Sequence, residues 1–152
     1  MSSQRYGSLP QDVFAVLHKS SGTINPIAVV ATVDRGGVPR TAPFGSLRAV
    51  TCKLLRLVSW RGHDTYANIC RDGHVAVALL SPPNIAVSIN GWARVVRERM
   101  NADEHHAIVE IYVDEVKSDM VRRIVIETPI TASILPEHQK WFKAVLGEAE
   151  EM

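Results

Sequence analysis

Residues 59–72, Ser-Trp-Arg-Gly-His-Asp-Thr-Tyr-Ala-Asn-Ile-Cys-Arg-Asp, are the stretch of this sequence best suited to chemistry. An apolar run that ends at Val58 predicts a strand, and the pattern then changes to that of a short helix beginning near Asp64. The first N–H groups of a helix lack partners and carry partial positive charge, so anions bind readily there. Hydroxyl and cationic donors surround the same point, on Ser59, Arg61, His63 and Thr65. The junction therefore predicts a phosphate site.

The same residues have a simpler interpretation. Asp64 or Thr65 would cap the helix through a side-chain oxygen, and Arg61 would be solvated. The two interpretations share one helix start and differ in whether an anion binds there.

The composition is that of one globular domain. A chain of 152 residues buries roughly two-thirds of the surface that it exposes when unfolded, so it needs no disulfide or metal. A net charge of +1 with interspersed signs predicts neither a nucleic-acid nor a membrane partner. The N-terminus has no apolar signal core, which predicts a cytoplasmic protein. Cys52 and Cys70 are too isolated for a redox or zinc motif, and we expect both to be buried or half-buried.

Apolar periodicity predicts many strands and few helices. Ser8 and Gln11 form a possible capping box for a helix over about 9–19. Strands are predicted at 27–33, 38–50, 54–60, 75–80, 85–95 and 121–134, the first of them covered on both faces. Further helices are predicted at 64–71, from Asn101 through the stripe of Val109, Tyr112, Val113 and Val116, and from Pro136 to about Gly147.

Gly91 interrupts the most regular strand pattern. Apolar and polar residues alternate from Ile85 to Val95, and this alternation continues through the Asn90-Gly91 pair. An Asn-Gly pair normally favours a hairpin turn, but a turn would break the alternation. Gly91 is therefore predicted to form a bulge or to accept the close approach of another group.

Antiparallel strands with peripheral helices predict a mainly β fold, a small closed or partly open β-barrel of about six to seven strands. A single domain would span residues 1–152. Residues 1–24 would form an N-terminal helix and linker, and residues 135–152 a C-terminal helix and acidic tail.

The order of these features resembles the FMN-binding split-barrel family, which includes pyridoxamine 5'-phosphate oxidase and small flavin-binding proteins. The resemblance covers about residues 28–97. Its matching segments are Ala28 to Thr32, Gly37-Val38-Pro39-Arg40-Thr41-Ala42-Pro43, the strand to Ser59, Thr65-Tyr66-Ala67-Asn68-Ile69-Cys70-Arg71-Asp72, Val75 to Leu80, and Gly91-Trp92-Ala93.

This resemblance implies a homodimeric split β-barrel with FMN at the subunit interface. It implies that Arg40 and Thr41 lie beside the phosphate or ribityl chain. The backbone along the isoalloxazine edge would be that of Ala42, Pro43 and Phe44.

The rest of the implied site comes from the next strand and helix. Ser59 and Trp60 would line the other side of the ligand, and Thr65 and Asn68 would meet it at the helix start. Family members often carry a lysine at or just before the position of Thr65, where this chain has Asp64 and Thr65. The cationic role would then fall on Arg40, Arg61 or His63.

The implied activity is that of an FMN-binding oxidoreductase with an unknown small-molecule substrate. A bound flavin would supply the redox chemistry, so no catalytic side chain is assigned. The C-terminal Arg-Leu-x-Pro ending of the true oxidase is missing, so the chain is not expected to be pyridoxamine 5'-phosphate oxidase itself. One alternative is a non-catalytic protein that binds a deazaflavin, haem or another planar ligand in the same cleft. A second, which the missing lysine favours, is a barrel that has lost its ligand and serves as a partner-binding module.

The histidines do not form a metal motif. Asp103, Glu104, His105 and His106 are consecutive, but adjacent histidines on a helix point in different directions and the i, i+4 spacing of a zinc helix is missing. We expect these side chains to be solvated and predict no metal site.

Overall fold

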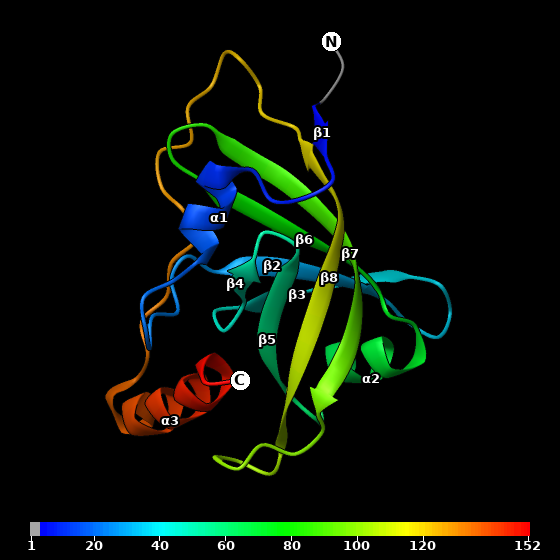
Figure 1. Cartoon of the computed structure of the whole chain (residues 1–152), viewed down its shortest axis with the longest axis vertical. Helices are drawn as coiled ribbons and strands as arrows, with labels where there is room; N and C mark the ends of the chain where they lie inside the picture. The colour runs from blue at the N-terminus through cyan, green and yellow to red at the C-terminus, as the bar shows by residue number, and fades with distance from the viewer. Residues whose placement is uncertain (1–3) are drawn as a thin grey trace.

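The strands form one antiparallel sheet, seen in the computed structural model, which describes residues 4–152 (Figure 1). The main strands are β2 (Ala28–Val33), β3 (Pro39–Phe44), β4 (Arg48–Thr51), β5 (Leu54–Trp60), β6 (His74–Ser81), β7 (Ile85–Arg97) and β8 (His106–Ser118). Their order is β3-β2-β6-β7-β8-β5-β4, and the short β1 (Arg5–Tyr6) pairs with β8. The predicted mainly β fold is confirmed.

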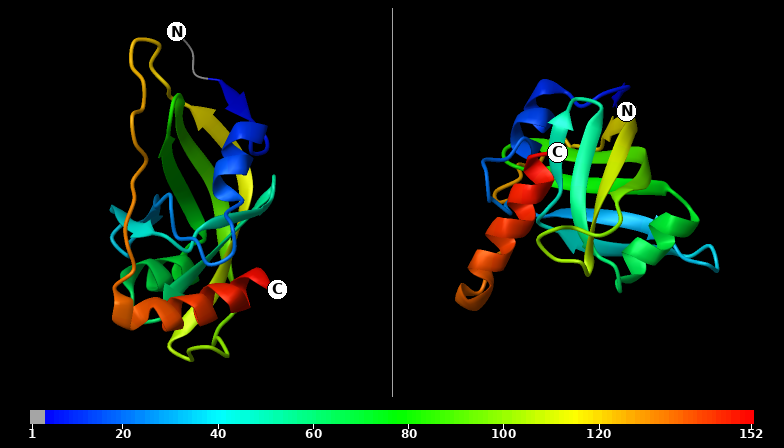
Figure 2. Two further views of the ribbon diagram at one scale, coloured as in Figure 1. Left: turned by 90° about the vertical axis from the view of Figure 1, so that its left-hand side faces the viewer. Right: turned by 60° about the horizontal axis from the view of Figure 1, so that its bottom comes forward.

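The sheet curls into a barrel whose two edge strands, β3 and β4, are consecutive in the chain (Figure 2). Ser46 lies in the turn between them and connects this turn to β5. Its Oγ donates to the carbonyl oxygen of Val58 (3.1 Å) and accepts from the Val58 N–H (2.9 Å). This side chain thus fastens the turn between the two edge strands to β5, beyond the end of the β4–β5 ladder.

Alternate residues of the strands fill the barrel, because successive side chains point to opposite faces. The largest fully buried side chains of the strands include Leu55, Leu57, Val77, Ile89 and Ile111. A second apolar cluster lies on the outside of the barrel, under the C-terminal helix: Val58, Met100, Ile108, Val145 and Ala149.

In the described part of the chain, four helical segments surround the barrel: α1 (Gln11–Leu17), α2 (Asp64–Arg71), the 3-10 turn η1 (Pro136–His138) and α3 (Gln139–Glu150). Figure 1 shows α2 and α3 on either side of the lower end of the barrel. Among the described residues, none of these helices combines the length and apolarity that a membrane crossing requires.

The predicted bounds of a strand or helix agree best with the structure where one hydrophobic pattern runs through the whole element. The strand at 54–60 and the helix at 64–71 are confirmed. The predicted 38–50 strand is two strands, β3 and β4. The first helix is shorter than predicted, and the capping box is wrong: Pro10 is the N-cap residue and no side chain caps the helix. The last helix runs past Gly147 to Glu150.

The predicted helix from Asn101 is wrong, because its apolar stripe belongs to β8. Residues 107–111 are all buried, since the barrel core covers one face of β8 and α3 covers the other. Burial on both faces removes the alternation by which a half-buried strand is recognised.

The strand predicted at 121–134 is also wrong. This segment runs along the outside of the barrel toward α3 without strand structure (Figure 2). It is held by separate backbone hydrogen bonds, from Ile126 N–H to the Pro83 carbonyl and from Ile27 N–H to the Ile130 carbonyl (both 2.8 Å). This segment therefore has the apolar β-branched composition of a strand but does not pair with a neighbouring strand.

The interpretation of Gly91 is confirmed. The β7–β8 register shifts between Asn90 and Gly91, and a Cβ atom at Gly91 would lie 2.4 Å from the carbonyl oxygen of Tyr112. The expectation for the cysteines is wrong: Cys52, in the turn before β5, and Cys70, on α2, are both exposed.

Candidate functional site

The edge strand β3 carries the first half of the predicted site. Its ladder in the described chain is with β2 alone, so the backbone groups on its other side are available for hydrogen bonding. Thr41 and Pro43 are exposed, whereas Ala42 and Phe44 are buried in the barrel core. The strand thus presents a polar backbone edge beside two exposed side chains.

The start of α2 lies beside the end of β3. The ring centroids of Phe44 and His63 are 6.1 Å apart in an edge-on arrangement. His63 is the N-cap residue, and its Nδ1 accepts the N–H of Thr65 (3.1 Å). The prediction that Asp64 or Thr65 caps the helix is therefore wrong. Asp64 is instead the exposed first residue of the helix.

Three of the predicted polar residues are buried and hold this junction together. Asn68 donates through Nδ2 to Thr32 Oγ1 (3.0 Å), which fastens α2 to β2. Ser59 donates through Oγ to the Trp60 carbonyl (3.2 Å), and Thr65 is only 4% exposed. These side chains position the helix start from within.

The two arginines of the predicted site are already engaged by acidic partners. Arg40 donates from Nε to Asp34 (2.9 Å), although its side chain is 62% exposed. Arg61 lies 3.6 Å from Glu98 through Nη2, and its backbone N–H donates to the His105 carbonyl. Arg61 Nε is buried without an acceptor in the part of the chain that the structure describes.

Trp60 adds an aromatic surface to the junction. Its side chain is 54% exposed, and a Cβ atom at Gly62 would lie 2.6 Å from its ring. The ring therefore packs directly on the backbone ahead of α2. An exposed indole in this place can stack on a planar ligand or contact another subunit.

The predicted residues lie along β3, at the end of β5 and along α2, with Phe44 beside His63 at the start of the helix and Arg40 beside Asp34 at the other end of β3. Their accessible part consists of Arg40, Thr41, Pro43, Trp60 and His63, with Arg61 partly exposed. Their buried part consists of Ala42, Phe44, Ser59, Thr65 and Asn68. The accessible part lies on an open surface.

Sequence reasoning missed the outer face of strands β3, β2, β6 and β7. Cross-strand pairing places Pro43, Val29, Ala78 and Ser88 in one row. The adjoining row consists of Thr41, Ala31, Ala76 and Asn90. Leu80 and Ala86 extend the face, and none of these ten side chains is charged. The sequence did contain a signal for this uncharged outer face, because small apolar residues alternate with core residues in β2 and β6.

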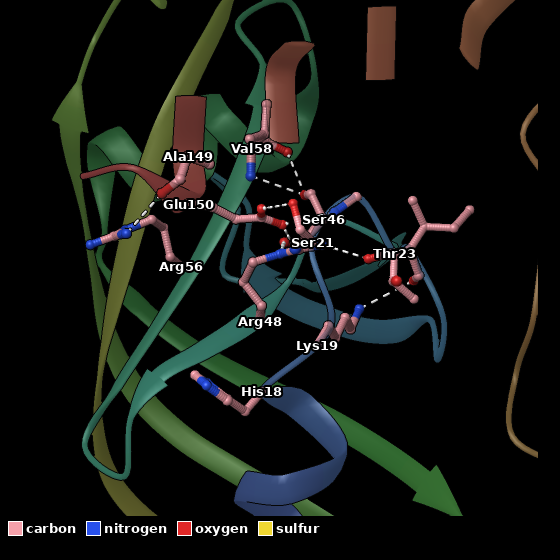
Figure 3. Close-up of polar contacts among 12 residues, drawn as sticks. His18, Lys19, Ser21, Thr23, Ser46, Arg48, Arg56, Val58, Ala149 and Glu150 are labelled. Atoms are coloured by element: carbon pink, nitrogen blue, oxygen red, sulfur yellow. Dashed lines mark hydrogen bonds and ion pairs between the residues drawn. The ribbon is translucent and has the colours of Figure 1, made fainter. Parts of the chain in front are cut away.

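A second polar cluster joins α1, β4 and α3 (Figure 3). Lys19 Nζ donates to the carbonyl oxygens of Ile24, Pro26 and Gly45 at 2.9–3.1 Å. Arg48 is almost fully buried and pairs with Glu150, which also accepts from Ser21. A cavity of about 260 Å³ adjoins this cluster. Because these donors already have acceptors, the cluster fastens the fold and is a poor ligand site.

Burial, and secondly the charge of Arg48, lower the pKa of Lys19 from 10.5 to about 7. Above pH 7 the folded amine releases its proton while the unfolded chain keeps it, so stability rises with pH up to about 10.5. Relative to Lys19→Met, the wild type should gain up to roughly 2 kcal/mol between pH 7 and pH 9 in urea unfolding. Lys143→Met, at an exposed lysine of α3, is the control. A wild-type advantage over Lys19→Met that stays constant or falls with pH would contradict this prediction.

The larger cavity, of about 720 Å³, lies between β1, α1 and residues 118–124. Neither cavity is lined by a predicted site residue. Across residues 4–152, no group of three or more His, Cys, Asp or Glu side chains is placed to hold a metal ion.

The architecture and the junction define an antiparallel split-barrel protein, and comparisons with known proteins identify its family. The family model of pyridoxamine 5'-phosphate oxidase matches residues 23–133. The chain belongs to this family. A search of curated proteins finds no match.

Solved structures agree with this fold. A provisionally assigned pyridoxamine 5'-phosphate oxidase from Lactobacillus delbrueckii has a TM-score of 0.59 at 20% identity, covering 76% of this chain and 98% of its own. An F420 reductase has a TM-score of 0.54 at 15% identity, covering 69% and 95%. An FMN-binding protein from Syntrophomonas wolfei has a TM-score of 0.51 at 15% identity, covering 71% and 89%. At these identities the likeness establishes the fold alone.

Proposed function

We propose that this protein is a homodimer that binds a flavin, FMN or a deazaflavin, at the subunit interface and acts as a flavin-dependent oxidoreductase on a small molecule. The observation that carries this proposal is the uncharged outer face, which adjoins the free edge of β3. The flavin-binding character of the family supports it.

The outer face supports a dimer for a physical reason. A strand with one face in water normally alternates apolar and polar residues. In β2, the outward residues Val29 and Ala31 are apolar, and in β6 Ala76, Ala78 and Leu80 are apolar as well. A second copy of the chain would cover this face. Since Thr41 and Pro43 belong to both the face and the predicted ligand site, the partner subunit would complete that site.

The residues at the junction fit a flavin. The exposed indole of Trp60 and the backbone edge of β3 suit a planar ring with polar atoms on its rim. The buried Arg61 Nε lacks an acceptor among residues 4–152, and His63 and Thr65 lie at a helix start, where an anionic group is favoured. When bound, the flavin supplies hydride or electron transfer. The protein's part is to hold the ring, bind the phosphate and exclude water.

Flavin titration tests the proposal. Purified protein should quench the fluorescence of added FMN or deazaflavin F420 and gain thermal stability, because a ligand that binds only the folded state stabilises it. Stabilisation by haemin alone would favour the alternative of a non-catalytic haem protein. Reduction of the bound flavin by NADH or NADPH then separates an oxidoreductase from a binding protein.

Ala78→Arg tests the dimer and the site together. Ala78 is exposed at the centre of the uncharged face, so the folded chain can accommodate arginine, whereas a dimer would bury an unpaired charge. We expect a monomer in light scattering and flavin affinity lowered by about tenfold or more. Ala144→Arg, at an exposed position of α3, is the matched control and should change neither. A dimeric Ala78→Arg variant would place the interface elsewhere.

A further inference from the structure

The larger cavity, between β1, α1 and residues 118–124, has no part in the proposed flavin site. Its volume is about 720 Å³. Small-molecule sites usually measure roughly 300–1,000 Å³, and the mouth of a β-barrel is a common place for them. Figure 1 shows β1 and α1 at the upper end of the molecule and α2 at the lower end. A ligand in this cavity would therefore lie at the opposite end of the barrel from the start of α2.

The wall of this cavity has a buried apolar part and an exposed apolar part. Val13, Ile85 and Val87 line it and are 2%, 5% and 9% exposed. Val121 and Ile124 also line it, but they are 51% and 53% exposed. Covering half-exposed apolar side chains removes apolar surface from water, which is favourable. The wall therefore suits a ligand with an apolar body.

The charges of the wall favour an anionic head group. Among the described residues, the charged ones that line the cavity are Asp12, Asp119 and Arg122. Asp12 Oδ1 accepts the N–H of Val13 at 2.9 Å, and Asp119 Oδ1 lies 3.0 Å from Nζ of Lys117. None of the ion pairs found in the described part of the chain includes Arg122, which is exposed. The two acids thus have partners of their own, and the guanidinium is available to a carboxylate.

Backbone hydrogen bonds fix the part of the wall that carries this cation. Asp119 N–H donates to the carbonyl oxygen of Ala86 (2.9 Å), which fastens the segment after β8 to the start of β7. Ile124 N–H donates to the carbonyl oxygen of Val121 (3.3 Å) and closes a turn that contains Arg122. A wall that is already held in place loses little conformational entropy when a ligand binds.

We infer that this cavity binds a carboxylate with an apolar chain, which packs between the buried and the exposed apolar side chains while its head group pairs with Arg122. The inference goes beyond the proposed flavin function and does not depend on it, because no residue of the predicted flavin site lines the cavity. It adds a second ligand site, of different chemistry, at the other end of the barrel.

Calorimetric titration of the full chain with octanoate and decanoate tests the apolar part of the site. Decanoate should bind about fifteenfold more tightly than octanoate, with one molecule per chain, because it buries two further methylene groups. Equal affinities for the two carboxylates would show that the apolar wall is not used. No binding of decanoate at millimolar concentration would overturn the inference.

Four variants at exposed positions test the head group and the exposed apolar part. Arg122→Gln should lower decanoate affinity about fivefold and leave the affinity for decanol unchanged, since an exposed ion pair contributes little. Arg123→Gln, at a neighbouring position outside the wall, is the matched control. Val121→Asp should weaken the binding of both ligands, whereas Val125→Asp, also outside the wall, should weaken neither. Equal losses in Arg122→Gln and Arg123→Gln would overturn the assignment of the head group.

Methyl NMR tests the location of the ligand. Decanoate should shift the methyl resonances of Ile85 and Ile124, which line the cavity, and leave those of Ile108, under α3, unchanged. Added FMN should not displace decanoate. Displacement by FMN, or shifts at Ile108 as large as those at Ile85, would place the carboxylate elsewhere and overturn the inference. Binding of decanoate without any binding of a flavin would instead overturn the proposed function and leave this inference intact.

Discussion

Arg56→Ala should destabilise the protein by about 3–5 kcal/mol, because it leaves a carboxylate buried without its cation. Arg56 on β5 and Glu110 on β8 are direct cross-strand neighbours under α3. The guanidinium donates from Nε and Nη2 to Glu110 Oε2 at 3.0 and 2.6 Å. The two side chains are 7% and 11% exposed, so solvent cannot replace the lost partner. Urea unfolding of the variant measures the loss.

The same substitution also loosens α3. Arg56 Nη1 donates to the carbonyl oxygen of Ala149 (2.8 Å), near the C-terminal end of the helix. Carbonyl groups in the last turn of a helix have no partner within it. Arg56→Ala therefore leaves both a carboxylate and this carbonyl unsatisfied. We expect the substitution to accelerate hydrogen exchange of the α3 backbone amides, relative to the wild type, more than that of the β7 amides.

The double variant Arg56→Met with Glu110→Leu is the control. A buried ion pair pays a large desolvation cost, so well-packed apolar residues of similar volume often replace it without loss. We expect the double variant to lie within about 1 kcal/mol of the wild type. A double variant as unstable as Arg56→Ala would show that packing under α3, rather than charge, causes the effect.

Local pattern predicted the elements that position the site. The apolar run from Leu54 to Trp60 and the change of period at Asp64 were sufficient to predict β5 and α2. The buried face of each element is visible in the hydrophobic pattern of its own residues. The assignment of the candidate residues to one ligand site stays a prediction.

Contacts between distant residues explain the errors. The alternation of β8 is lost at residues 107–111 because α3, which begins only at Gln139, covers its outer face. The error at the cap of α2 is local instead: oxygen caps at Asp64 or Thr65 were expected because they are common, whereas an imidazole nitrogen of His63 caps the helix. The uncharged outer face depends on strand order, and β2 and β6 become neighbours only in the folded sheet.

Gly91→Ala tests the bulge that did follow from the sequence, and it should cost about 3 kcal/mol. The added Cβ would lie 2.4 Å from the Tyr112 carbonyl oxygen and 2.8 Å from Ile111 Cγ2. The first of these atoms is backbone of β8, so a rotamer change cannot relieve the contact. The β7–β8 ladder must therefore shift at its register change between Asn90 and Gly91.

Gly147→Ala is the matched control for this substitution, and its expected effect has the opposite sign. A Cβ atom at Gly147 would meet nothing within 4 Å, and the residue lies within α3. Alanine in a helix is favoured over glycine by about 1 kcal/mol, so this variant should be more stable than the wild type. Thermal unfolding of both variants measures the contrast. A Gly91→Ala variant as stable as the wild type would contradict this prediction. It would show that β7 and β8 can move apart at the bulge and relieve the 2.4 Å contact without loss of stability.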